Sequence, residues 1–211
     1  MRENYLKDRG THRFPLLTNV VLVGLSGSGK STIGKNLAWQ LGLGFLDLDD
    51  AIEASEKKKI HTICVERGIS HFRDLESKSI MLLASIRNHV IAVGGGALEN
   101  EENYKVLESL GLLTWIDTPV STIAWRLANN PAELKKRPLL ADLYEERDKS
   151  SRCLKLQARL DSMLSEREHK YKEAAISLRD CGSAPEICAR RLIHLMDRHW
   201  NGKKAQKSPR A

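Results

Sequence analysis

A glycine-rich segment near the start of the chain has the composition and spacing of a phosphate-binding loop. Residues 24–32 read Gly-Leu-Ser-Gly-Ser-Gly-Lys-Ser-Thr, which fits the pattern G-x-x-x-x-G-K-[ST]. Glycines let consecutive N–H groups point at phosphate oxygens, and the dipole of the following helix adds to the attraction. The residues expected to bind a nucleotide in this way are Gly27, Ser28, Gly29, Lys30, Ser31 and Thr32.

Two side chains of this loop would carry distinct chemistry. The Lys30 ammonium is expected to place its charge at the β- and γ-phosphates, and the Ser31 hydroxyl is expected to contact Mg²⁺. The alternative is a glycine- and serine-rich turn with no ligand, which the strand before the loop and the helix after it make the weaker interpretation. The loop alone indicates a nucleotide and magnesium, and it does not identify the acceptor of a phosphoryl group.

Short apolar strands alternate with helical segments along the chain, and they must position these groups. The expected strands are 19–23, 45–48, 90–93, 112–116 and 176–178. The expected helices are 30–41, segments within 50–86 (70–86 above all), 101–110, 119–127, 150–175 and 185–200. This order predicts an α/β fold, a three-layer α/β/α arrangement around a central five-stranded parallel sheet. Ligands bind such sheets beyond the carboxyl ends of the strands, so Gly24, Asp47–Asp49 and Gly94–Gly96 are expected to meet there.

Length and charge set the outer limits. A chain of 211 residues suits one domain, expected at 17–200 between a flexible N-terminus (1–16) and a basic disordered tail (201–211). The net charge of +7 lies mostly in the two ends, so we expect no nucleic-acid partner. Apolar runs are too short to cross a membrane and no targeting signal is visible, which favours a cytoplasmic protein with no membrane partner.

Four cysteines are present, and none belongs to a C-x-x-C pair or shares metal-binding spacing with a histidine. They are Cys64, Cys153, Cys181 and Cys188. We expect reduced, mostly structural thiols, as is typical of a cytoplasmic protein.

Further motifs follow the phosphate loop in a fixed order. They are Phe45-Leu46-Asp47-Leu48-Asp49, Phe72-Arg73-Asp74-Leu75-Glu76, Gly94-Gly95-Gly96, Arg137-Pro138-Leu139-Leu140, and Arg167 with Tyr171. The combination resembles the shikimate kinase family, one of the nucleoside-monophosphate-kinase-like P-loop proteins, over about residues 17–198.

This resemblance implies a P-loop kinase fold with a mobile lid at about 129–149. It implies that ATP and Mg²⁺ are used to phosphorylate the 3-hydroxyl of shikimate, giving shikimate 3-phosphate and ADP in chorismate and aromatic amino-acid biosynthesis. It also implies a monomer. A gluconokinase-like polyol kinase and a catalytically silent nucleotide-binding homologue are the alternatives.

The resemblance assigns the acceptor side to residues that suit a small anionic polyol. Arg73 and Arg167 would hold the carboxylate, because arginine forks offer paired donors and stay charged. Asp49 would contact the reacting hydroxyl, and it would orient that group or take its proton. Gly94, Gly95 and Gly96 would donate backbone N–H groups, with a purely structural turn as the alternative. Glu76 could hold Arg73 from the same helix face, or the two could form an ordinary surface pair.

The resemblance also assigns the nucleotide side. Asp47 would contact Mg²⁺ through water, and Arg137 would close from the lid onto the transferred phosphate. Lys30, Asp49 and Arg137 are therefore the expected catalytic residues. Asp50 is expected to cap the following helix instead of binding metal.

Two further positions belong to the adenine end. Arg126 would stack on the adenine ring, with an exposed helix arginine as a nearly equal alternative. Residues 180–185 resemble the adenine loop and end at Pro185.

The chain departs from the family pattern between Arg137 and Arg167, a stretch about ten residues longer than usual. The proline–leucine pair that the family commonly has before Tyr171 is absent. Arg159 therefore stands as the alternative to Arg167 for the second carboxylate contact.

Overall fold

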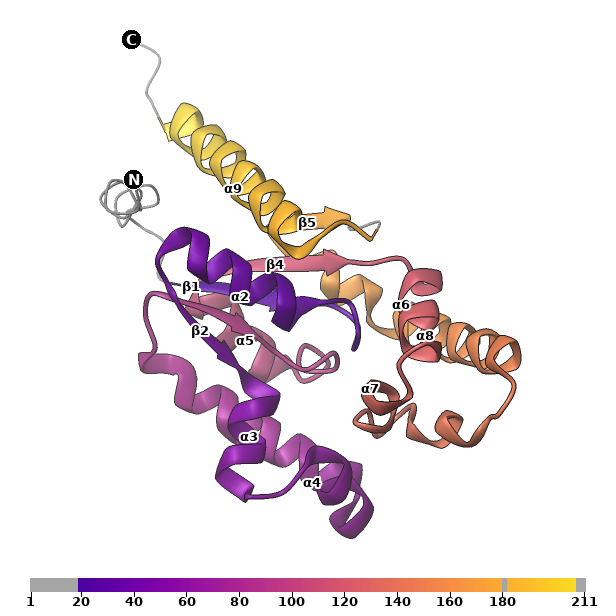
Figure 1. The fold of residues 1–211 in the computed structure, drawn as a ribbon. Helices are drawn as coiled ribbons and strands as arrows, with labels where there is room; N and C mark the ends of the chain where they lie inside the picture. Colours follow the sequence, from indigo (N-terminus) through magenta and orange to yellow (C-terminus); the bar gives the residue numbers. More distant parts are fainter. Residues whose placement is uncertain (1–18, 180–181, 208–211) are drawn as a thin grey trace, which may run out of the picture.

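A parallel sheet of five strands crosses the part of the chain that this computed structural model describes, residues 19–179 and 182–207 (Figure 1). The strands are β1 (Asn19–Val23), β2 (Gly44–Asp47), β3 (His89–Ala92), β4 (Leu112–Asp117) and β5 (Ile176–Arg179). Their order in the sheet is β2-β3-β1-β4-β5, and every pairing is parallel. The predicted α/β class and five-stranded parallel sheet are confirmed. Leu48 begins a helix, so the expected end of the second strand at this residue was wrong.

Helices cover both faces of the sheet, which makes a three-layer fold. On one face lie α2 (Lys30–Leu41) and α9 (Pro185–Lys207), which pack against each other; in Figure 1, α9 is the yellow helix at the top and α2 the indigo helix below it. The helices associated with the other face, directly or through the helices packed on it, are α3 (Leu48–Glu56), α4 (Ile60–Leu82), α5 (Glu101–Leu110), α6 (Val120–Ala128), α7 (Pro131–Lys135) and α8 (Lys149–Tyr171).

Strand β1 is buried on both sides for this reason. Val20 and Leu22 pack with α2 and α9, whereas Val21 and Val23 pack with the helices of the opposite face. A strand covered on both faces is apolar over most of its length, as the run Val20–Val23 predicts, and the side chain of buried Asn19 donates to the Ile86 and Leu110 carbonyl oxygens.

The lid segment (129–149), for which no helix was predicted, is folded. It contains α7 and a 3₁₀ helix, η2 (Ala141–Glu145). Leu134, Leu140 and Leu143 are buried and join the main core. These leucines pack the segment against the rest of the core, and its predicted mobility stays a prediction.

The helix predicted to be strongest differs from the expectation at its end. Helix α4 stops at Leu82, whose side chain is 78% exposed, and a 3₁₀ turn (Leu83–Ser85) turns Leu83 inward. Leu82 lies off the buried face of the helix, because Phe72, Glu76 and Ile80 are buried at intervals of four residues and Leu83 continues that face. Gly68, with φ of 85°, also breaks the helix near its middle.

The ends of the described chain bear on other predictions. Helix α9 continues to Lys207, beyond its predicted end at Trp200. Residues 1–16, Cys181 and the end of the tail (208–211) lie outside the described residues.

Cys64 and Cys153 carry free thiols, and the Cys188 sulfur lies 3.8 Å from the Ser183 carbonyl oxygen. Within the described ranges, none of the helices has the length and apolarity needed to cross a membrane.

The strand register brings three carboxyl ends together. Ala92 of β3 pairs with Leu22 of β1 on one side and with Asp47 of β2 on the other. The chain leaves these strands at the phosphate loop, at the Asp47–Asp49 segment and at the triple glycine. A Cβ built on Gly95 would lie 3.0 Å from the Ser26 backbone nitrogen, so the two loops are in contact.

Candidate active site

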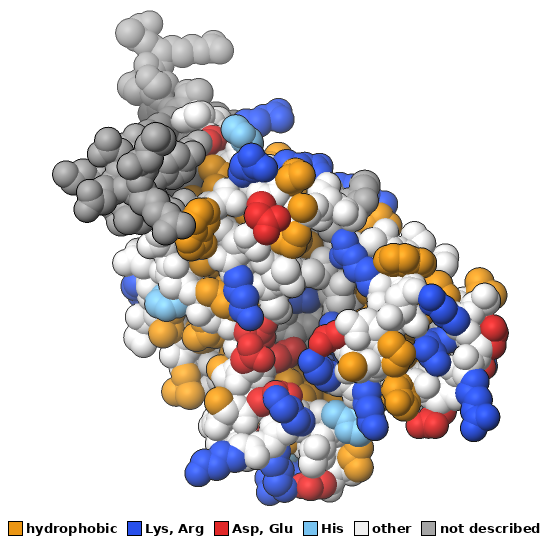
Figure 2. Space-filling model, in the orientation of Figure 1, with side chains coloured by type: hydrophobic (Ala, Val, Ile, Leu, Met, Phe, Trp, Pro, Cys, Tyr) orange, Lys and Arg blue, Asp and Glu red, His pale blue; other side chains and the backbone are white. Residues whose placement is uncertain are grey.

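A cavity of about 650 Å³ opens at this edge of the sheet. Figure 2 shows a hollow in the middle of the face, with acidic and basic side chains along its rim. All of the predicted site residues except Ser28 line the cavity: Gly27, Gly29, Lys30, Ser31, Thr32, Asp47, Asp49, Arg73, Gly94, Gly95, Gly96, Arg126, Arg137, Arg167 and Pro185. Ser28 is fully buried behind the loop, where its carbonyl oxygen accepts a hydrogen bond from Thr118 at 2.8 Å.

The phosphate loop owes its shape to glycines. Gly24, Gly27 and Gly29 have φ of 137°, 86° and 96°, conformations that other residues adopt only with strain. The curl places the Lys30 ammonium inside the loop, where it donates to the carbonyl oxygens of Gly24 (2.8 Å) and Leu25 (2.9 Å). Burial lowers the pKa of Lys30 to about 8, although nearby Asp49 and Asp47 act in the opposite direction.

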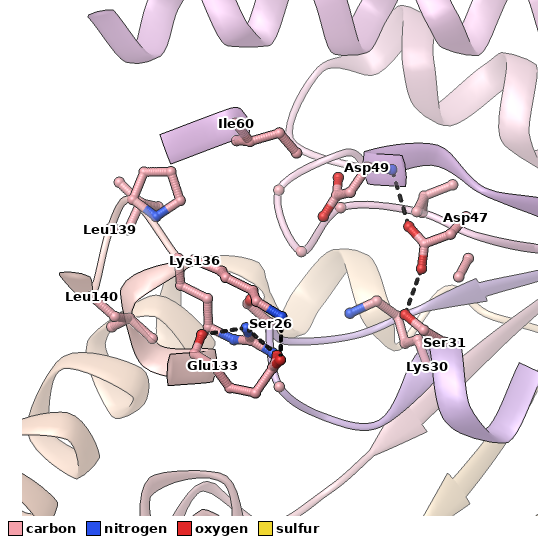
Figure 3. Close-up of a pocket in the computed structure, with 18 of the residues that line it drawn as sticks. Ser26, Lys30, Ser31, Asp47, Asp49, Ile60, Glu133, Lys136, Leu139 and Leu140 are labelled. Atoms are coloured by element: carbon pink, nitrogen blue, oxygen red, sulfur yellow. Dashed lines mark hydrogen bonds and ion pairs between the residues drawn. The ribbon is translucent and has the colours of Figure 1, made fainter. Parts of the chain in front are cut away.

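Asp47 connects the phosphate loop to helix α3. Its Oδ2 accepts a hydrogen bond from the Ser31 hydroxyl at 2.5 Å, and its Oδ1 accepts one from the Asp49 backbone at 3.0 Å (Figure 3). Asp47 is therefore the N-cap of α3. The expectation that Asp50 caps this helix was wrong: the chain turns helical at Leu48, which leaves Asp50 exposed in the first turn.

Asp49 presents an acceptor with no fixed partner. Its Oδ1 is enclosed, and the described residues provide it with no hydrogen bond. Burial, followed by the charge of Asp47, raises the pKa of Asp49 to about 6, against the attraction of Lys30. A carboxylate in this state suits a ligand hydroxyl, because it lacks a donor and lies beside the lysine ammonium.

Arg73 and Glu76 form a pair on one face of α4. Arg73 donates to Glu76 Oε2 at 2.6 Å, and the Glu76 side chain is only 1% exposed. The alternative interpretation, that Arg73 and Glu76 form an ordinary surface pair, is therefore wrong, because the Glu76 carboxylate is buried. Burial raises the pKa of Glu76, and the positive charge of Arg73 opposes the rise.

The triple glycine makes room for this pair. A Cβ on Gly94 would overlap Glu76 Oε1, and one on Gly96 would overlap the Arg73 guanidinium. Glycine is therefore required for the backbone to approach both charged groups closely.

Arg167, and not Arg159, reaches the cavity. Arg167 lies in the penultimate turn of α8, is 6% exposed, and donates through Nε to Glu99. Arg159 instead donates to the Leu139 carbonyl oxygen (3.1 Å) and to Asp142 (2.6 Å). Its guanidinium ties the lid segment to α8 and does not line the cavity.

The lid segment forms the wall opposite the two aspartates. Figure 3 shows Glu133, Lys136, Leu139 and Leu140 on this side. Arg137 donates to the Glu133 carbonyl oxygen at 2.8 Å, and its Nε is enclosed without a hydrogen-bond acceptor among the residues described here.

The adenine end is only partly described. Arg126 lies close to Gly29, whose built Cβ would be 3.9 Å from Arg126 Nη1, and Pro185 begins α9. Residues 180–181 of the predicted adenine loop lie outside the described residues.

Several residues at the cavity were not predicted from the sequence. Glu133 could have been found, because it precedes Arg137 by four positions and neighbouring helix turns face each other. Lys59, Met163 and Glu99 carry no such signal, since only the tertiary fold brings them to the cavity or to Arg167.

The donors at the phosphate loop fit a hydrated magnesium ion. The described residues contain no cluster of three or more histidine, cysteine, aspartate or glutamate side chains suited to a metal. Mg²⁺ needs no such cluster, because it usually keeps several waters and binds one or two protein oxygens with substrate phosphates. The Ser31 hydroxyl and the Asp47 carboxylate supply hard oxygen donors of that kind.

Comparisons with known proteins agree with this geometry. The family model described as shikimate kinase matches residues 26–197. A shikimate kinase of Persephonella marina is 41% identical over 136 residues, which cover 63% of this chain and 83% of the relative. One from Chlorobium limicola is 34% identical over 84% of this chain and 87% of its own length.

Solved structures give the same result. A shikimate kinase from Acinetobacter baumannii, in complex with shikimate, aligns with a TM-score of 0.75 at 30% identity, covering 87% of this chain and 94% of that one. A gluconokinase from Sinorhizobium meliloti has a TM-score of 0.54 at 18% identity, a likeness of fold alone. The family model and the relatives together cover most of the chain, which therefore belongs to the shikimate kinase family.

Proposed function

We propose that this protein transfers the γ-phosphoryl group of ATP to the 3-hydroxyl of shikimate, giving shikimate 3-phosphate and ADP in chorismate biosynthesis. The single observation that carries the proposal is the convergence of the phosphate loop, Asp49, Arg73 and Arg167 on one cavity in a chain of this family.

The phosphate loop would hold ATP, with Lys30 at the β- and γ-phosphates. Lys30 is held between the Gly24 and Leu25 carbonyl oxygens, so its charge is in place before a nucleotide binds. Ser31 and Asp47 would hold Mg²⁺, Asp47 through water. The ion, when bound, would neutralise phosphate charge during transfer.

The acceptor would lie across the cavity, with its carboxylate on the Arg73 and Arg167 guanidinium groups. Backbone N–H groups of the triple glycine would donate to the ring acid at close range. Asp49 would accept a hydrogen bond from the 3-hydroxyl and aim its oxygen at the γ-phosphorus.

In the transfer step the hydroxyl oxygen forms the new bond to the γ-phosphorus, and the bond to the β–γ bridging oxygen breaks. ADP leaves, and the hydroxyl proton passes to Asp49 or to solvent. A loose transition state demands little base strength, so positioning is the larger task of Asp49. Arg137 would stabilise the charge on the moving phosphoryl group from the lid segment.

The expected monomer and cytoplasmic location belong to the same proposal. The fit of Ser31 and Asp47 to a hydrated cation supports magnesium in particular.

ADP release by the purified protein tests the proposal. The assay compares shikimate with gluconate and with no acceptor, at fixed ATP and Mg²⁺. We expect stimulation by shikimate alone. Stimulation by gluconate but not by shikimate would replace the proposal with a polyol kinase, and ATP binding without transfer to either acid would favour a silent homologue.

A further inference from the structure

A charged side chain outside the cavity holds Arg167, one of the two arginines proposed to bind the carboxylate of the acceptor. Glu99 lies in the loop between β3 and α5, and its Oε1 accepts a hydrogen bond from Arg167 Nε, 68 residues away in the sequence. The Arg167 side chain is 8% exposed and lines the cavity, whereas the Glu99 side chain is 44% exposed and does not. Glu99 therefore contacts Arg167 without lining the cavity itself.

Glu99 binds the Nε edge of the Arg167 guanidinium, and this determines which N–H donors remain for a ligand. A guanidinium carries its five N–H donors in one rigid plane, and a partner on Nε fixes that plane. Arg167 also hydrogen-bonds the Tyr171 side chain, and its remaining terminal N–H groups stay available for a carboxylate in the cavity. A buried arginine also needs a charged partner before the ligand arrives, because an unpaired buried charge is costly.

A competing acceptor lies nearby. Glu76 Oε1 is enclosed without a hydrogen-bond donor in the described part of the chain. The charge of Arg167 reaches this carboxyl group and acts to lower its pKa, against the effect of burial. Without Glu99, Arg167 would be drawn toward Glu76, which already holds Arg73. Glu99 gives Arg167 a carboxylate partner of its own, while Glu76 remains the partner of Arg73.

We infer that Glu99 is a positioning residue for the substrate carboxylate: it acts through Arg167 and keeps the two arginines on separate glutamates. The inference rests on the proposed function and names what holds the acid-binding end of that same site. It extends the assignment of Arg167 to a residue that never touches the substrate.

The same two chain segments are joined at two other points. The Tyr171 hydroxyl donates to the Gly95 carbonyl oxygen, and Lys170 pairs with Glu101 at 3.0 Å. The end of α8 should therefore stay on this loop when Glu99 is changed, so Glu99→Gln is expected to fold. Glu101→Gln is a matched control, because it removes an equal charge between the same segments without contacting Arg167 or the cavity.

Steady-state kinetics of the full chain test the inference. For Glu99→Gln we expect the KM for shikimate to rise about tenfold, because a neutral amide oxygen replaces the partly exposed carboxylate that accepts from Arg167. We expect kcat and the KM for ATP to stay within about twofold of wild type. Glu101→Gln should match wild type, and Glu99→Asp should recover part of the affinity.

A second background isolates the action through Arg167. If Glu99 works through this residue alone, Glu99→Gln adds no further loss when Arg167 is already alanine. An unchanged KM for shikimate in Glu99→Gln would overturn the inference, as would a further loss in the Arg167→Ala background. Equal losses toward both substrates with a lowered melting temperature would reduce Glu99 to a structural role.

Kinetics of the wild-type protein in the same series distinguish failure of the proposed function from failure of the role given to Glu99. Absence of shikimate-dependent ADP release in the wild-type protein would overturn the proposed function itself. Activity in wild type together with an indifferent Glu99→Gln variant would overturn only the role of Glu99.

Discussion

The cavity has two sides that are built in different ways. The phosphate side consists of residues 24–32 with Asp47, a nearly continuous segment whose backbone shapes the site. The acid side consists of Arg73, Glu76, the triple glycine, Glu99 and Arg167, which come from three distant segments. The first is stabilised mainly by local hydrogen bonds and glycine conformations. The second is stabilised by the Arg73–Glu76 pair within α4 and by the Arg167–Glu99 pair, which joins segments 68 residues apart.

This difference has a functional consequence. On the phosphate side, groups are placed by the chain immediately around them, so a single change should remove a catalytic contact and leave the rest intact. On the acid side, each cavity-facing arginine has its own glutamate, and a change in any member should alter how tightly the acid is held. We therefore expect phosphate-side variants to lose kcat and acid-side variants to lose affinity for shikimate.

The largest expected effect is on the phosphate side. Lys30→Ala removes the one ammonium inside the loop, and we expect kcat to fall by about 10²–10³-fold, as when other preorganised donors are lost. Lys35→Ala is the control, because Lys35 is exposed on the same helix and lies over the Phe45 ring, outside the cavity. Near-normal turnover in Lys30→Ala would contradict the expectation that phosphate-side variants lose kcat.

On the acid side, Arg73→Ala should act chiefly on the acceptor. Loss of a charged contact of about 2 kcal/mol raises the KM for shikimate about 30-fold, with a smaller effect on the KM for ATP. Arg67→Ala, an exposed arginine on the same helix bonded to His71, serves as its control. Unchanged affinity for shikimate in Arg73→Ala would remove Arg73 from the acid side.

The pH profile of kcat/KM tests the roles given to the ionised forms of Asp49 and Lys30. With a pKa raised to about 6, Asp49 is protonated at lower pH and loses its role as acceptor, so kcat/KM should fall about tenfold at pH 5. Lys30, with a pKa lowered to about 8, loses its charge at higher pH in the free enzyme, which adds an alkaline limb. A flat profile between pH 5 and 7 would contradict the role given to Asp49.

The smallest effect is expected at the triple glycine. Gly96→Ala would push a methyl group into the Arg73 guanidinium, and we expect a rise of about five-fold in the KM for shikimate with kcat nearly unchanged, less than removing a charged hydrogen bond. Gly202→Ala on α9, where an added Cβ meets no atom within 4 Å, should behave as wild type. An equal KM for shikimate in the two variants would show that the close approach of the Gly96 backbone to Arg73 does not affect binding of the acid.

The two sides also differ in how far the sequence predicts them. Residues 24–32 could be assigned at once, because the motif is local and its glycines have one physical purpose. Arg73 and Arg167 could be assigned only through a resemblance, and Glu99 not at all, since no spacing connects positions 99 and 167. The same distinction holds for the fold. The apolar strand β1 was predicted correctly, whereas the helices of the lid segment were not predicted, because the core that buries Leu134 and Leu143 comes from elsewhere.

The most direct test of this account is a structure of the protein with shikimate and a non-hydrolysable ATP analogue. We predict the shikimate carboxylate within hydrogen-bond distance of Arg73 and Arg167, and the 3-hydroxyl oxygen on Asp49, facing the terminal phosphate held by Lys30. A carboxylate bound elsewhere, or a 3-hydroxyl turned away from Asp49, would contradict the division of the cavity into these two sides.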